Sequence, residues 1–154
     1  MTRFSARDRS TEVVQADQGA LWKALTDPDL LPRLTPYLHS IDAEGDLWRW
    51  NMARIPVLGV SVAPSFTERM TFDEPRRIDF THDPESGQEK AGVEGTYELE
   101  EVEGGTRLSI DLDICVDLPL PGIARGAVER AMRGVIAAMG RRFAANLLRH
   151  LSDG

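Results

Sequence analysis

A long alternation of apolar and polar residues, broken by turns, is the feature that most limits the folds open to this chain. It runs from residue 37 to residue 118, and turn signals such as Asp73-Glu74-Pro75 and Gly104-Gly105 divide it. A period of two is typical of strands with one buried and one wet face, which favours antiparallel pairing. The sequence therefore predicts an antiparallel sheet of six to seven strands. The clearest stretch places on one face Leu108, Ile110, Leu112, Ile114, Val116 and Leu118.

A long helix follows the last predicted strand. Pro119 and Pro121 end that strand, and the segment 122–151 then shows apolar residues at helical spacing. Such a stripe must lie on an apolar surface, and the dry face of the sheet is the candidate. We therefore expect an α+β fold in which the sheet wraps around this helix. The stripe contains Val128, Met132, Val135, Ile136, Met139, Phe143 and Leu147.

Two short helices are expected before the alternating region. A first strand over residues 4–14 precedes Asp17, whose carboxylate is suited to cap a helix. Thr26-Asp27-Pro28 ends that helix, and a second short helix runs through Leu34. The length of 154 residues favours one domain spanning 1–154.

Charge and composition exclude several classes of protein. The net charge of −7 argues against a nucleic-acid partner. No apolar run approaches the ~20 residues of a membrane span, and the N-terminus has no secretory signal pattern. Cys115 is the only cysteine, so we expect a reducing, cytoplasmic location. Residues 120–152 carry six Arg against Glu129 alone, which we interpret as a solvated face or as a surface for anionic lipid or a partner.

No metal, nucleophile or nucleotide motif is present, so we expect no metal and no cofactor. Candidate catalytic residues are Glu68, His82 and Tyr97, which share the inward parity of their strands, as His39 does. A carboxylate near an apolar cavity acquires a raised pKa and suits general acid or base work. The alternative is structural: Glu68 pairs with an arginine, the histidines lie at open strand ends, and Tyr97 belongs to the core.

The inward face also supplies candidate ligand-binding residues. They are large, apolar or aromatic, and the predicted helix faces the strands that carry them. The inward face encloses either packed side chains or an open space, and in the second case the lining comprises Trp48, Trp50, Phe66, Met70, Phe80, Tyr97, Met132, Val135, Ile136 and Met139. Arg125, in the first turn of the long helix, is a further candidate to guard the mouth of such a space.

Local signatures add a resemblance to a known superfamily. The first strand and helix end in Leu25-Thr26-Asp27-Pro28, a later strand begins at Glu74-Pro75-Arg76-Arg77-Ile78, and a hairpin reads Gly104-Gly105-Thr106-Arg107-Leu108. With the long final helix, this order resembles the START/birch-allergen-like (SRPBCC) superfamily, especially its polyketide cyclase/dehydrase-like branch. The resemblance covers about residues 10–150 and implies a helix-grip fold, in which a bent antiparallel sheet grips the C-terminal helix with an apolar cavity between them. Its motifs mark turns and the ends of helices and strands, and they are not catalytic.

Three hypotheses for function follow. The first is binding or transport of a hydrophobic small molecule, such as a lipid, polyketide or quinone-like compound. The alternative is a polyketide cyclase/aromatase-type enzyme, which needs two inward polar groups near one substrate position. The third is an adaptor that meets a partner through its basic helix. Whether the chain is an enzyme, and whether it forms a homodimer, both stay open at this level.

Overall fold

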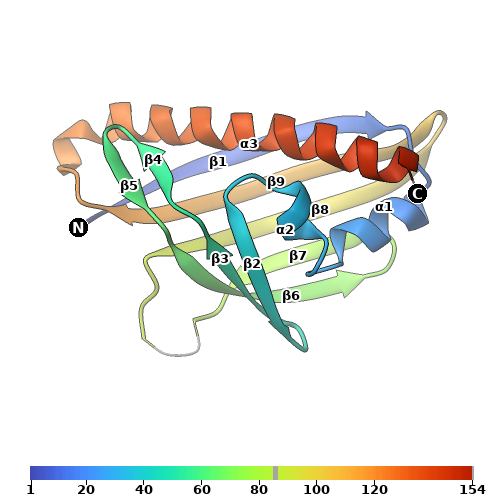
Figure 1. Cartoon of the computed structure of the whole chain (residues 1–154), viewed down its shortest axis with the longest axis horizontal. Coiled ribbons are helices and arrows are strands. Elements are labelled where there is room, and N and C mark those ends of the chain that lie inside the picture. The colour runs from blue at the N-terminus through green and yellow to red at the C-terminus, as the bar shows by residue number, and fades with distance from the viewer. Residues whose placement is uncertain (85–86, 154) are drawn as a thin grey trace.

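A computed structural model describes residues 1–84 and 87–153. Nine strands and three α-helices make up this part of the chain (Figure 1). In chain order they are β1 (Thr2–Val14), α1 (Gln18–Leu25), α2 (Leu31–Leu34), β2 (Leu38–Glu44), β3 (Leu47–Met52), β4 (Ile55–Val57), β5 (Val60–Val62), β6 (Ser65–Asp73), β7 (Arg77–His82), β8 (Ala91–Val102), β9 (Gly105–Leu118) and α3 (Arg125–Asp153). A 3-10 turn over Gly122–Ala124 leads into α3.

The main sheet has seven strands in the order β1-β9-β8-β7-β6-β3-β2, and every neighbouring pair is antiparallel. Figure 1 shows α3 lying along this sheet beside β1, with the two short helices near its C-terminal end. The predicted α+β helix-grip architecture, with two short helices after the first strand, is confirmed.

The apolar–polar alternation from Val60 to Phe72 carries no turn signal, yet it spans two strands, β5 and β6. Ala63 and Pro64 separate β5 from β6, and β4 and β5 form a small hairpin of their own. A proline nitrogen cannot donate a ladder hydrogen bond, whereas the Pro64 carbonyl accepts one from Met52 at 2.9 Å. Because the interruption is two residues long, it preserves the parity of the pattern and hides the break in the sequence.

The expected start of α1 is present in the structure. Asp17 is the N-cap, and its Oδ2 accepts a hydrogen bond from the Ala20 N–H at 3.2 Å. Thr26 closes the other end by donating from its hydroxyl to the Trp22 carbonyl at 2.8 Å. The helix buries Leu21, Trp22, Ala24 and Leu25, so a local cap and a short apolar face are enough to define it.

Two separate hydrophobic clusters anchor the ends of α3. Val128 and Met132 near its N-terminal end pack with Phe4 and Leu118 of the sheet. Leu147 near its C-terminal end belongs to the cluster formed with α1, α2 and the other half of the sheet. The apolar residues of the stripe between these anchors are only half-buried: Val135, Ile136 and Met139. The middle of α3 therefore faces a space that side chains do not fill.

The glycines of α3 permit no close contact with the sheet. A Cβ atom built at Gly126, Gly134 or Gly140 would meet nothing within 4 Å. Gly134→Ala is therefore expected to raise the free energy of unfolding by about 0.5–1 kcal/mol, because alanine loses less backbone entropy than glycine in a helix. Urea denaturation measures this change. A loss of stability would show that α3 needs a bare backbone at this position.

Candidate functional site

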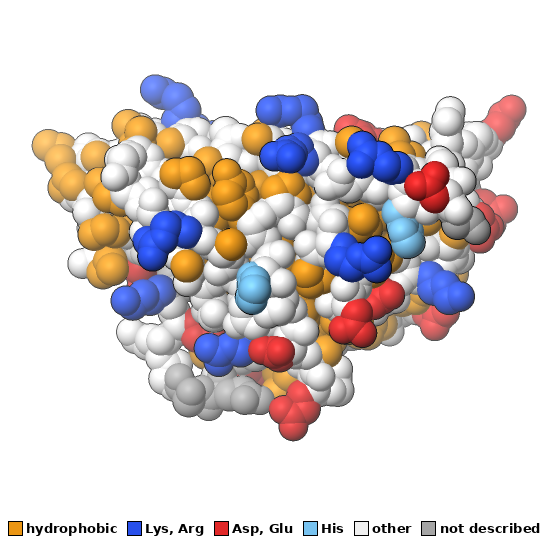
Figure 2. Space-filling model, in the orientation of Figure 1, with side chains coloured by type: hydrophobic (Ala, Val, Ile, Leu, Met, Phe, Trp, Pro, Cys, Tyr) orange, Lys and Arg blue, Asp and Glu red, His pale blue; other side chains and the backbone are white. Residues whose placement is uncertain are grey.

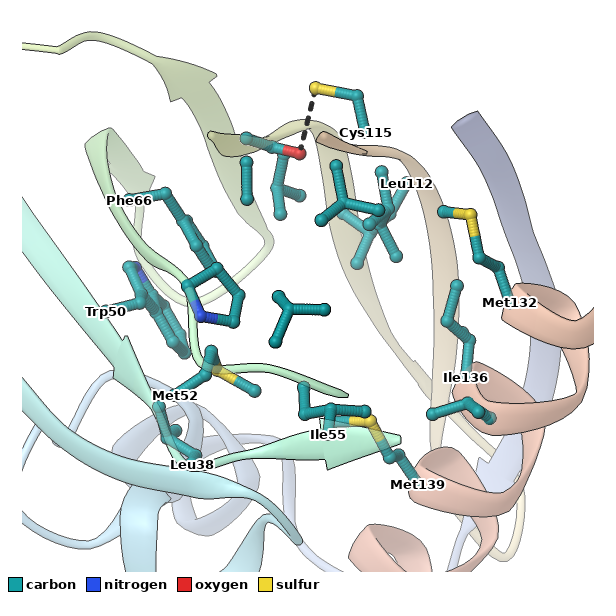
Figure 3. A pocket seen from close by; sticks show the side chains of 18 of the residues that line it. Leu38, Trp50, Met52, Ile55, Phe66, Leu112, Cys115, Met132, Ile136 and Met139 are labelled. Carbon is teal, nitrogen blue, oxygen red and sulfur yellow. Dashed lines mark hydrogen bonds between the residues drawn. The ribbon is translucent and has the colours of Figure 1, made fainter. Parts of the chain in front are cut away.

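A cavity of about 240 Å³ lies between α3, the β4–β5 hairpin and the concave face of the sheet. Figure 3 shows Met132, Ile136 and Met139 of α3 on one side of it, and Trp50 and Phe66 of β3 and β6 on the other. The lining comprises Thr35, Leu38, Trp50, Met52, Ile55, Val57, Val62, Pro64, Phe66, Phe80, Ala91, Gly92, Val93, Tyr97, Leu112, Ile114, Cys115, Val116, Leu118, Met132, Val135, Ile136 and Met139.

The cavity wall is almost entirely carbon and sulfur. Three methionines, Met52, Met132 and Met139, contribute flexible thioether chains that repack at low cost around different shapes. Cys115 completes the wall near Gly92, with its thiol donating to the Gly92 carbonyl oxygen at 3.6 Å (Figure 3). Burial raises the pKa of the Cys115 thiol, so this side chain remains a neutral, apolar part of the lining.

Most of the residues that strand and helix periodicity selected for the lining do line the cavity. Trp50, Phe66, Phe80 and Tyr97 lie on the sheet side of the cavity, opposite the four expected residues of α3. Trp50 and Phe66 are nearly parallel, at an interplanar angle of 5° and a centroid distance of 6.3 Å. Phe80 and Tyr97 are neighbours, with ring centroids 5.0 Å apart. The sheet side therefore presents a continuous aromatic wall.

Trp48 and Met70, expected in the lining, are instead part of the packed core. They are 3% and 2% exposed, and Trp48 contacts Phe72 with ring centroids 5.7 Å apart. The register explains the difference. Trp50 pairs with Phe66 at the cavity, whereas Trp48 pairs with Glu68 two residues further along the two strands. Inward parity selects the face of a strand, but the position along the strand decides which side chains reach the cavity.

Glu68 and His82 also lie outside the cavity lining, as a pair immediately behind it. His82 Nδ1 is 3.1 Å from Glu68 Oε2 and 3.1 Å from the carbonyl oxygen of Thr67. The Val93 N–H donates to the same Oε2 at 3.3 Å. On its other side, His82 Nε2 lies 3.7 Å from Glu89 Oε1. The structural alternative, in which Glu68 pairs with an arginine, is wrong about the partner, which is His82.

The Glu68–His82 pair lies where strands β7 and β8 separate. The β6–β7 ladder continues to Glu68 opposite His82, whereas the β7–β8 ladder stops at Phe80 opposite Gly95. Beyond that point β8 pairs only with β9. Oε2 of Glu68 accepts the Val93 N–H where a strand carbonyl would otherwise do so. Side chains therefore replace backbone pairing across the split.

Gly92 lies between the cavity and the ring of His82. It lines the cavity, and a Cβ built on it would lie 2.7 Å from His82 Cγ. The imidazole ring thus packs directly against the bare backbone of β8. The backbone of β8 at this residue therefore lies between the apolar space and the His82 ring.

Burial governs the protonation of Glu68, which is 0% exposed. Loss of water raises the pKa of its carboxyl from 4.5 to about 8, against the opposing effect of the Val93 N–H. The Thr67 carbonyl can only accept, so a hydrogen bond from His82 to it requires the ring proton on Nδ1. Glu68 Oε1 has no partner among the described residues. With its pKa raised to about 8, the Glu68 carboxyl keeps its proton near neutral pH.

The remaining candidates differ in their surroundings. Burial, together with the nearby Asp8 carboxyl, raises the pKa of Tyr97 to about 12, so the phenol stays neutral beside the cavity. His39 is exposed and takes no part in the site. Arg125 does not guard the mouth: its Nη1 donates to the Arg3 carbonyl at 2.9 Å, and its guanidinium lies 5.1 Å from the ring centre of Phe4. It ties α3 to the edge strand instead.

Sequence reasoning missed part of the lining. Met52 and Leu112 share the inward parity of residues that were singled out, so their pattern contained the signal. Cys115 has the opposite parity in β9 and nevertheless lines the cavity. The β4–β5 hairpin contributes Ile55 and Val57, whose position over the cavity follows from no periodicity in the chain.

An antiparallel sheet that holds a long C-terminal helix across an apolar cavity defines the helix-grip class of proteins. The family model described as "Polyketide cyclase / dehydrase and lipid transport" matches residues 6–148, and the chain belongs to this family. The predicted membership of the START-like superfamily is thereby confirmed. A search of curated protein sequences finds no significant match.

Solved structures support the same fold at low sequence identity. A conserved protein from Geobacillus kaustophilus is 16% identical with a TM-score of 0.76, over 96% of this chain and 95% of that one. The Zhui aromatase/cyclase from Streptomyces sp. R1128 is 12% identical with a TM-score of 0.66, over 96% and 94%. A START superfamily protein from Mycobacterium smegmatis is 18% identical with a TM-score of 0.66, over 96% and 97%. At these identities the likeness concerns the fold.

The longest helix, α3, carries too many polar residues to cross a bilayer. Among the described residues no helix combines the length and hydropathy that a membrane span requires.

Proposed function

We propose that this protein binds or transports a hydrophobic small molecule in the cavity beneath α3. The observation that carries the proposal is the cavity itself, about 240 Å³ of space with apolar walls between two packed clusters. Protein interiors are normally close-packed, and an apolar cavity of roughly 150 Å³ is enough to hold benzene. The space is therefore large enough for a ligand with a fused-ring body or a folded acyl chain.

The composition of the wall supports a ligand recognised mainly by shape. Aromatic rings of Trp50, Phe66, Phe80 and Tyr97 form one side, and aliphatic and thioether side chains form the rest. Ligand sites usually combine such walls with few polar groups. The family description includes lipid transport, which agrees with this reading.

A cyclase-type activity is the second candidate. It is favoured by the buried acid Glu68, whose raised pKa of about 8 suits proton transfer near neutral pH. The structural likeness to an aromatase/cyclase supports it at the level of fold. Against it, neither Glu68 nor His82 is part of the cavity lining, and the His82 ring packs against the far side of the lining residue Gly92. Carrier function needs no such contact and is preferred.

Filling the cavity should abolish ligand binding without disturbing the fold. Ile136→Trp places an indole in the cavity from α3, and we expect the Kd for the neutral apolar dye Nile red to rise about tenfold or more. Fluorescence titration measures the Kd. Ala137→Trp is the matched control, because residue 137 is exposed on the outer face of the same turn. Equal dye binding by both variants and the natural protein would place the dye elsewhere and contradict the proposal.

A further inference from the structure

One edge of the cavity lies between α3 and the segment that joins α2 to β2. Asn146 lies on this flank of α3 and donates from Nδ2 to the Leu34 carbonyl at 2.9 Å. The next residue in the chain, Thr35, lines the cavity, as do Met52 and Ile55, and all three are half-buried. This edge, called the mouth below, is bounded by one flank of α3, the end of α2 and the β3–β4 connection.

An arginine stands on the α3 side of this mouth. Arg142 lies one turn before Asn146 and three residues after the lining residue Met139, and side chains at these spacings share a helix flank. Its side chain is exposed and forms no ion pair with any residue that the structure describes. The guanidinium is thus available to a charge placed at the mouth.

A second arginine stands on the opposite side. Arg54 lies between the lining residues Met52 and Ile55, is exposed, and has no ion pair within residues 1–84 and 87–153. The N–H of the preceding Ala53 donates to the Tyr37 carbonyl at 2.6 Å. Tyr37 is 41% exposed and has a positive φ of 66°, a strained conformation of the kind that gathers at ligand sites.

The surroundings of the mouth are short of acidic groups. Figure 2 shows Lys and Arg side chains scattered with hydrophobic ones over the face formed by α3 and the β4–β5 hairpin. Most acidic side chains visible in this view lie toward its right end and lower edge. Residues 120–152, which include Arg142, carry six Arg against one acid, Glu129. Glu129 lies on the other flank, where it accepts the Ser5 N–H at 2.9 Å.

We propose that the natural ligand is an amphiphile whose carboxylate head binds at the mouth between Arg54 and Arg142 while its apolar body fills the cavity. The inference rests on the proposed function, to which it adds the chemistry of the head group. A charged head cannot enter a wall of carbon and sulfur without losing its hydration. At the mouth it keeps contact with water and meets guanidinium groups, whose paired donors match a carboxylate.

Two probes that differ only in the head group test this inference. Pyrenebutyrate and pyrenebutanol share the aromatic body and the chain, and only the first is charged at neutral pH. We expect the natural protein to bind pyrenebutyrate about fivefold more tightly, as exposed ion pairs provide. In R54Q/R142Q the two probes should bind equally, with the Kd for pyrenebutanol unchanged. High salt should weaken the preference of the natural protein.

A charge-matched control separates a local contact from a general effect of net charge. Arg130 and Arg133 are exposed on α3 away from the mouth, so R130Q/R133Q should keep the preference for pyrenebutyrate. Loss of the preference in this control, or equal binding of both probes by the natural protein, overturns the head-group assignment and leaves the cavity proposal intact. Failure of both probes to bind overturns both.

Discussion

Replacing Glu68 by glutamine should remove most of the pH dependence of stability between about pH 5 and pH 8. Burial raises the pKa of the Glu68 carboxyl from 4.5 to about 8. The folded chain therefore keeps a proton that the unfolded chain releases in this window, so the free energy of unfolding falls as pH rises through it. A pKa unit corresponds to about 1.4 kcal/mol, which limits the loss to about 5 kcal/mol.

The stabilities of the natural protein and Glu68→Gln should cross within that window. Near pH 5 the variant is expected to be the less stable, because an amide NH2 replaces the Oε1 position that has no partner among the described residues. Above about pH 8 it should be the more stable, because it cannot ionise. Urea denaturation at several pH values measures both arms.

Glu101→Gln provides the comparison for this experiment. Glu101 also lies on β8, but it is exposed and its charge is not among the causes of the raised Glu68 pKa, so its substitution should leave the pH profile almost unchanged. Parallel profiles for the natural protein and Glu68→Gln across the whole range would show that Glu68 is ionised in the folded protein. Such a result would also remove the support for Glu68 as a proton donor in a cyclase.

Gly95→Ala should cost several kilocalories per mole and leave little folded protein. Gly95 has a φ of 149°, and a Cβ atom there would lie 2.0 Å from the Asp111 carbonyl oxygen and 2.8 Å from the Leu112 Cα. Both atoms belong to the neighbouring strand β9, so the clash can be relieved only by moving backbone. We expect a loss on the order of 3–5 kcal/mol, a large part of the stability of an ordinary domain.

Gly104→Ala distinguishes the clash from the cost of an unusual φ. Gly104 has a φ of 90°, but a Cβ there would meet nothing within 4 Å. Its substitution should therefore cost only about 1–2 kcal/mol of backbone strain. Thermal and urea denaturation of both variants give the comparison. Similar losses at the two positions would mean that β8 does not approach β9 as closely as the structure indicates.

The sequence by itself determined the layers of this protein. Alternation in β9, the stripe of α3 and the Asp17 cap are periodic or local signals, and each produced the expected element. Residues that line the cavity from α3 could be chosen in advance because a helix of known phase has only one face to offer the sheet. Trp50 and Phe80 could likewise be chosen in advance, because alternate residues of a strand point to the same face of the sheet.

Only the tertiary structure decided where the cavity begins and ends. Trp48 and Trp50 have the same parity, yet the first lies in the core and the second in the cavity wall. Glu68 was singled out by parity, but the split between β7 and β8 at Gly95 puts it behind Gly92 with His82 as its partner. Arg54 and Arg142 carry no signal in sequence, since they are 88 positions apart. Periodicity reports which face of an element is apolar, whereas bends, splits and distant neighbours depend on how all the elements pack together.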